Sequence, residues 1–91
     1  MEEKVTIEQI SQSIRNFLFE NYLFGYDENE FSNDSSFLDF GVLDSTGILE
    51  LIVFIESEFE IEVSDMEILP ENLDSVNRVS RLVYKKLNPL S

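Results

Sequence analysis

The sequence contains neither cysteine nor histidine among its 91 residues. The absence of cysteine removes any disulfide framework, which agrees with a cytoplasmic protein. The absence of both residues excludes the Ser–His and Cys–His arrangements that activate a nucleophile. It also removes the ligands that zinc prefers. We therefore expect no metal site and no catalytic residue, so that the isolated chain is not an enzyme.

Glycine is scarce and long apolar runs are missing. The three glycines, at positions 25, 41 and 47, cannot form a glycine-rich phosphate loop. No stretch reaches the roughly eighteen apolar residues of a membrane span, and residues 1–4 lack the basic start of a signal peptide. A calcium loop beginning at Asp27 fails, because Phe31 and Leu38 would take its fifth and twelfth positions. We expect no membrane insertion.

Basic residues are few, and the centre of the chain has none. The net charge is −13, and no Lys or Arg lies between Arg15 and Arg78. That interval holds all of the 19 acidic residues except Glu2, Glu3 and Glu8. Such a surface repels phosphate backbones and anionic lipids, which excludes nucleic-acid binding. It attracts enzymes that carry basic patches; a role in solubility alone is the alternative.

The apolar residues are sufficient for one folded domain over residues 1–91, which we expect to be monomeric. They make up 43% of the chain and include eight Phe, a content that disordered chains lack. A first helix is predicted to begin after Thr6, because Thr6 and Gln9 have capping-box spacing, and Gly25 is predicted to terminate it. Its apolar stripe consists of Ile7, Ile10, Ile14, Phe17 and Leu18.

Three further helices are predicted after a long connection. The connection, residues 26–43, is expected to be held on the core by its apolar side chains, namely Phe31, Phe37, Leu38, Phe40, Val42 and Leu43. The second helix should run from Asp44 or Ser45 to Phe59, although residues 48–55 also suit a strand. A short third helix should open at Ser64 and close at Pro70. The last should begin near Asp74 or Ser75. The predicted fold is therefore all-α: a four-helix bundle with a short third helix and a long loop between helices 1 and 2.

Ser45 is the most informative candidate residue, because it stands where that loop meets the second helix. Asp and Ser are preferred helix-capping residues, so the simplest interpretation of Asp44 and Ser45 is an N-cap. The alternative interpretation of Ser45 is a modification site. The chain has no histidine or cysteine to activate the Ser45 hydroxyl, so another enzyme would have to modify it.

The surrounding residues resemble the acyl carrier protein family. Gly41, Asp44 and Ser45 match the family's Gly-x-x-Asp-Ser-Leu signature, with Thr46 in place of the leucine. A helix containing Glu50 and Leu51 follows, then an acidic end, residues 56–63. The resemblance extends through the capping box at Ser64 to the last helix. Gly47, which lowers helix propensity, makes the site similar to carriers for D-alanine and other amino acids.

The resemblance implies a cofactor, partners and functional residues. Ser45 would carry 4′-phosphopantetheine, transferred from coenzyme A by a phosphopantetheinyl transferase that also uses Asp44. The resemblance places partner docking on Thr46, Leu49, Glu50, Val53, Glu56 and Ser57. It implies a freestanding carrier of acyl thioesters in fatty acid, polyketide or related biosynthesis, with loading and acyl-transferring enzymes as partners. The alternatives are an aminoacyl or D-alanyl carrier with the same arm, and an unmodified acidic interaction module.

Overall fold

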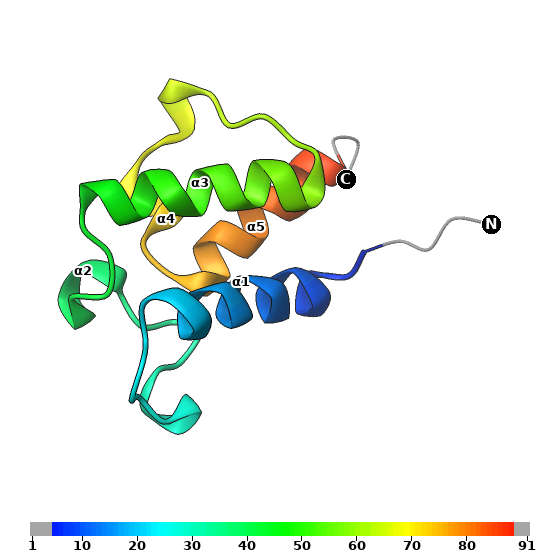
Figure 1. The fold of residues 1–91 in the computed structure, drawn as a ribbon. Coiled ribbons are helices and arrows are strands. Elements are labelled where there is room, and N and C mark those ends of the chain that lie inside the picture. The colour runs from blue at the N-terminus through cyan, green and yellow to red at the C-terminus, as the bar shows by residue number, and fades with distance from the viewer. Residues whose placement is uncertain (1–4, 89–91) are drawn as a thin grey trace.

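The computed structural model describes residues 5–88, and every regular element in that range is helical (Figure 1). This confirms the predicted all-α class. The three long helices are α1 (Ile7–Asn21), α3 (Ser45–Phe59) and α5 (Val76–Leu87). The short elements are η1 (Glu28–Glu30), α2 (Phe37–Phe40), η2 (Asp65–Glu67) and α4 (Pro70–Leu73). No helix within residues 5–88 is long and apolar enough to span a membrane.

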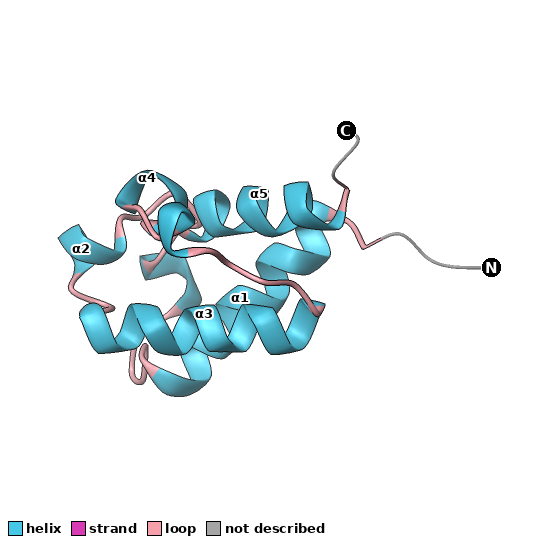
Figure 2. Ribbon diagram, turned by 90° about the horizontal axis from the view of Figure 1, so that it is seen from above, coloured by secondary structure: helices cyan, strands magenta, loops and turns pink. Residues whose placement is uncertain are grey.

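Helix α5 lies at the centre of the packing and contacts α1, α3 and α4. The view from above shows α3 along one side of the molecule, with α2 near its first turn (Figure 2). The side chains enclosed between the long helices are aliphatic and fully buried: Ile10, Ile14, Leu18, Leu51, Ile55, Val76, Val79 and Val83. Ser80 is also buried, and its hydroxyl is hydrogen-bonded to that of Ser11 at 2.8 Å, which joins α1 to α5.

The predicted starts of the long helices are confirmed, whereas the predicted end of α1 is wrong. The hydroxyl of Thr6 accepts a hydrogen bond from the Gln9 amide, and the Gln9 side chain accepts one from the Thr6 amide, which completes the capping box. Helix α1 ends at Asn21, before Gly25. The amides of Tyr22 and Leu23 both bond to the Leu18 carbonyl and close the helix early. Gly25 instead supplies a positive φ of 83° in the following turn.

The connection between α1 and α3 is partly helical, since it contains η1 and α2. Arg15 holds it against α1 by donating hydrogen bonds to the carbonyls of Glu28 and Phe31 and to the Asn33 side chain. Phe31 is buried as predicted. Leu38 is not: its side chain is 65% exposed. Helix α2 is a single turn that directs Phe37 into the core. The side chain of Leu38, the next residue, therefore points away from the core.

The prediction that Pro70 closes a helix is also wrong. The amide and hydroxyl of Ser64 both donate to the Glu67 carboxylate, but the turn that they open is only the 3-10 element η2. Pro70 is the first residue of α4. Proline suits this position because an N–H group at the first helical residue would have no acceptor within the helix, so its absence costs no hydrogen bond.

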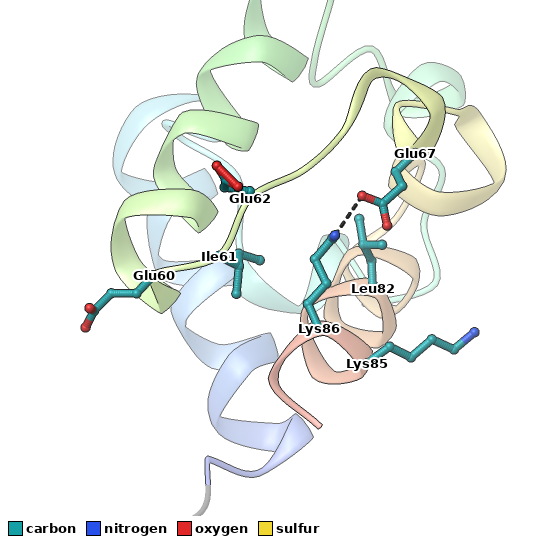
Figure 3. A pocket seen from close by; sticks show the side chains of 7 residues that line it. All are labelled: Glu60, Ile61, Glu62, Glu67, Leu82, Lys85 and Lys86. Carbon is teal, nitrogen blue, oxygen red and sulfur yellow. Dashed lines mark ion pairs between the residues drawn. The ribbon is translucent and has the colours of Figure 1, made fainter. Parts of the chain in front are cut away.

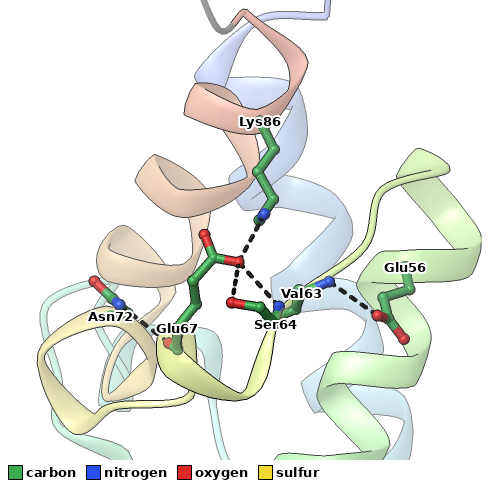
Figure 4. A network of polar contacts seen from close by, with 6 residues as sticks. All are labelled: Glu56, Val63, Ser64, Glu67, Asn72 and Lys86. Carbon is green, nitrogen blue, oxygen red and sulfur yellow. Dashed lines mark hydrogen bonds and ion pairs between the residues drawn. The ribbon is translucent and has the colours of Figure 1, made fainter.

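Glu67 connects η2 to α5 (Figure 4). Its carboxylate accepts from Ser64 and forms an ion pair with the Lys86 ammonium at 2.7 Å. The backbone carbonyl of Glu67 accepts from the Asn72 side chain. The contacts of its carboxylate hold the pKa of Glu67 below its ordinary value, first through the hydrogen bond from Lys86 and second through the Ser64 amide.

Removing the Lys86 ammonium should therefore raise the pKa of Glu67. A carboxyl whose pKa is lowered by folding contributes stability above its unfolded pKa, and this contribution is lost as the pH falls through the folded pKa. We expect Lys86→Met to move the Glu67 titration, followed by side-chain carboxyl NMR, to higher pH, and to reduce the loss of stability in that acidic window. Lys85→Met removes the same charge from an exposed neighbour. An equal shift in both variants would contradict the specific pairing.

Candidate functional site

The predicted junction between the loop and the second helix is the first turn of α3. The Asp44 carboxylate accepts a hydrogen bond from the Gly47 amide at 2.8 Å, and the Asp44 carbonyl accepts from Ile48 at 2.9 Å. Asp44 is thus the N-cap, and Ser45 is the first helical residue. The Ser45 side chain is exposed. Since Asp44 performs the capping, the Ser45 hydroxyl is not needed for that purpose.

Gly47 permits the close packing beneath this turn. It is buried, and a Cβ atom at this position would lie 3.0 Å from Cδ2 of Leu43. That distance is shorter than a comfortable carbon–carbon contact of about 3.5 Å. Leu43, the residue before the cap, is itself buried. The glycine therefore costs helix propensity but lets Leu43 anchor the loop under the start of α3.

The start of α3 fits an attached phosphate group. Among the first amides of a helix, those of Ser45 and Thr46 have no carbonyl acceptor within the helix. A helix of 15 residues also presents the positive end of its dipole there. An anionic group bonded to the exposed Ser45 hydroxyl would lie beside these N–H groups.

Four of the six predicted docking residues lie together. Thr46, Leu49, Glu50 and Val53 line one side of a hollow of about 340 Å³, with residues of α1 opposite. Leu49 and Val53 are 57% and 64% exposed. Glu50 is exposed, and its carboxylate accepts a hydrogen bond from the Tyr22 hydroxyl at the end of α1. The face therefore combines apolar side chains with a carboxylate.

The other two predicted docking residues lie outside this hollow. Glu56 is half-buried, and its carboxylate accepts from the Val63 amide at 3.0 Å (Figure 4). Its backbone carbonyl accepts from Ile61. Glu56 thus fastens the segment after α3 back onto the helix. Ser57 is exposed beside it.

Sequence reasoning missed an apolar pocket between α2, α3 and α4. The pocket has a volume of about 140 Å³, and its lining residues are Leu38, Ile48, Ile68, Leu69, Pro70, Leu73 and Asp74. These residues come from three separate elements, so no local pattern in the sequence marks them. A wider hollow of about 540 Å³ lies near the other end of α3, where acidic and basic side chains share the wall (Figure 3). Within residues 5–88, no three acidic side chains are arranged to hold a metal ion.

The small helical bundle and the exposed hydroxyl at a capped helix start suit a protein that carries a covalently attached group. Residues 23–83 match the family described as Phosphopantetheine attachment site. The chain therefore belongs to the phosphopantetheine carrier protein family, whose members hold 4′-phosphopantetheine covalently. This confirms the predicted family and cofactor.

Curated relatives include both acyl and aminoacyl carriers. The chain is 32% identical over 80 residues to an acyl carrier protein of Buchnera aphidicola subsp. Acyrthosiphon pisum (strain Tuc7), which covers 88% of this chain and 95% of the relative. It is also 37% identical over 54 residues to aminoacyl carrier protein 2 of Bradyrhizobium diazoefficiens. This alignment covers 59% of this chain and 60% of the relative.

A solved structure agrees with the fold. The match is to a chain in the crystal structure of Bradyrhizobium japonicum glycine:[carrier protein] ligase complexed with glycylated carrier protein. The TM-score is 0.63 at 26% identity, and the alignment covers 84% of this chain and 96% of that one. The helical arrangement described above is therefore one found in a solved structure.

The contact between Glu56 and Val63 predicts a structural cost for losing this carboxylate. Glu56→Ala should lower the free energy of unfolding by about 1 kcal/mol, because it leaves the Val63 amide without a charged acceptor. Urea denaturation of the purified protein measures this loss. Glu58→Ala removes an exposed carboxylate from the same helix and should change stability much less. Equal losses of unfolding free energy in the two variants would show that the contact between Glu56 and Val63 does not stabilise the fold.

Proposed function

We propose that this protein carries thioester-linked groups on a 4′-phosphopantetheine arm attached to Ser45 and delivers them to partner enzymes. The observation that carries this proposal is the exposed Ser45 hydroxyl on the first turn of α3, capped by Asp44. This position falls inside the region that matches the attachment-site family. The chain is then a substrate of other enzymes and needs no catalytic residue of its own.

Attachment forms one bond and breaks one. The Ser45 oxygen attacks the phosphorus of coenzyme A that bears the pantetheine, loses its proton, and displaces 3′,5′-ADP, with the transferase supplying the base. The amides of Ser45 and Thr46 would hold the phosphodiester of the attached arm, because these N–H groups have no acceptor within the helix and would stabilise its negative charge. When bound, the arm supplies a terminal thiol for thioester chemistry, and the chain has no cysteine to compete with it.

The relatives support two kinds of cargo equally. An acyl carrier protein and an aminoacyl carrier protein both resemble this chain, and the solved structure that it matches comes from a complex of an amino-acid ligase with its glycylated carrier. The proposed partners are accordingly a phosphopantetheinyl transferase, and acyl- or aminoacyl-loading enzymes whose basic patches meet the acidic surface around α3.

Attachment is tested by incubating the purified apo protein with coenzyme A and a broad-specificity phosphopantetheinyl transferase. Intact mass spectrometry should show one phosphopantetheine adduct on the wild-type protein and none on Ser45→Ala. Thr46→Ala keeps the adjacent hydroxyl of Ser45 and serves as the matched control, which should be modified. A wild-type protein that stays unmodified while a known carrier reacts would favour the unmodified interaction module.

Docking is tested by reversing the charge of Glu50. Because electrostatic attraction raises association rates between ten- and a thousandfold, Glu50→Lys should lower kcat/KM for modification by the transferase about tenfold at low salt. For this variant, kcat/KM should also change less when salt is added. Glu58→Lys makes the same charge change near the far end of α3, about 20 Å from Ser45 at 1.5 Å per residue. Equal slowing in both variants would assign the effect to net charge instead of local docking.

A further inference from the structure

The exposed side of α5 carries three cations in one row. Arg78, Arg81 and Lys85 are all exposed, and they follow one another at spacings of three and four residues, which places them on the same side of a helix. They line a hollow of about 370 Å³ between α5, α4 and η2. We call these three residues the α5 basic face. Half of the six basic residues of a chain with net charge −13 are therefore gathered on one side of one helix.

The α5 basic face makes few contacts within the fold. The other basic residues that the structure describes are engaged, since Arg15 fastens the loop after α1 and Lys86 pairs with Glu67. That pair is the only ion pair within residues 5–88, although the chain has 19 acidic residues. Arg78 donates one hydrogen bond, to the Glu71 carbonyl at 2.8 Å, and a guanidinium has five N–H donors. The face can therefore bind a group from outside the chain.

The dipole of α5 accounts for only part of this row. Lys85 lies in the last turn of the helix, where a cation is stabilising. Arg78 lies in the first turn, at the third residue of α5, where the positive end of the dipole disfavours a cation. Arg81 lies between the two ends. The stability of α5 thus does not explain why the row begins at Arg78.

The spacing of the cations favours a ligand whose negative charges are spread along its length. Between Arg78 and Lys85 the helix rises about 10 Å, at 1.5 Å per residue. A single phosphate would instead need cations that converge on it, and Glu67 and Glu71 in the wall of the hollow would repel it. Carboxylates four and three residues apart on a second helix match the row, and arginine binds a carboxylate through two parallel hydrogen bonds. The matching ligand is an acidic helix.

The charge around the α5 basic face disfavours longer polyanions. Duplex nucleic acid carries one negative charge per about 1.7 Å, so it would extend past the row of cations onto acidic surface. The molecule measures 39 × 29 × 20 Å, whereas charges are screened over about 8 Å at physiological salt. Seen from above, α3 lies along the side opposite α5 (Figure 2). The local positive charge, more than the net charge, therefore governs the approach of a short acidic segment.

We propose that the α5 basic face is a docking surface for an acidic helix of a partner protein. It is separate from the face of α3 beside Ser45, because it lies on α5, across the molecule. The inference requires neither an arm on Ser45 nor any modification of the chain. Its failure would therefore leave the proposed function intact, and the reverse also holds.

The test adds a synthetic acidic peptide to the full unmodified chain at physiological salt. The probe is an alanine-rich helical peptide whose glutamates are four and three residues apart, on one side of the helix. A control peptide has the same composition, with its glutamates two residues apart and hence on different sides. Backbone amide NMR should show shifts centred on residues 71–85 with the probe and much smaller shifts with the control. Shifts centred on residues 44–53 would overturn the proposal, because they would place the peptide on α3.

Charge-removing variants test the cations themselves. Arg81→Gln removes one exposed cation and should raise the Kd of the probe about threefold, the effect of one favourable surface ion pair. Arg81→Gln combined with Lys85→Gln should raise it about tenfold. Lys86→Gln is the matched control, since it removes the same charge from the same helix but outside the lining of the hollow. An equal rise in Kd for Arg81→Gln and Lys86→Gln would overturn the docking surface in favour of net charge.

Two further measurements test the kind of partner. A single-stranded oligothymidylate should bind the wild-type chain more weakly than the probe peptide, and tighter binding would overturn the acidic helix in favour of a phosphate polymer. A dilution series without peptide should leave the amide signals of residues 71–85 unchanged. Shifts of these signals with protein concentration would overturn the separate partner and assign the face to a second copy of the chain.

Discussion

The hydrogen bond from the Gly47 amide to the Asp44 carboxylate determines where α3 begins, and the candidate site depends on that start. Because Asp44 is the cap, Ser45 becomes the first helical residue and keeps its hydroxyl in solvent. Because Gly47 has no Cβ, Leu43 packs beneath the turn closer than a Cβ atom at this position would comfortably allow. Capping, loop anchoring and exposure of Ser45 are consequences of one local geometry.

Some charged side chains of this protein form contacts within the fold, whereas others lie on its exposed surface. Arg15 and Lys86 hold segments of the fold together, the first by fastening the loop after α1 and the second by pairing with Glu67. Glu56 is also committed to an internal contact. Glu50 is the carboxylate beside the exposed apolar face of α3. An acidic composition therefore does not make every carboxylate part of a docking surface.

The sequence predicted features that depend on local chemistry. Capping residues located the starts of α1, α3 and α5, and apolar periodicity identified the face of α1 on which Ile10, Ile14 and Leu18 are buried. Predictions failed where tertiary contacts or competing local rules determine the structure. Helix α1 ends before Gly25, and Pro70 begins a helix instead of ending one. Leu38 points outward from the single turn of α2. The hydrogen bonds from Ser36 and Leu38 to the Asp74 carboxylate join residues 38 and 36 positions apart along the chain, so neither they nor the pocket between α2, α3 and α4 has a local signature.

Localising the attached group on the intact protein decides whether Ser45 is the attachment residue. No Lys or Arg lies between Arg15 and Arg78, so fragmenting the whole modified chain in the mass spectrometer resolves the site better than tryptic digestion. We expect fragments broken between residues 44 and 45 and between residues 45 and 46 to place the entire phosphopantetheine mass on Ser45. Finding that mass on Thr46, or on any residue outside the first turn of α3, would contradict it.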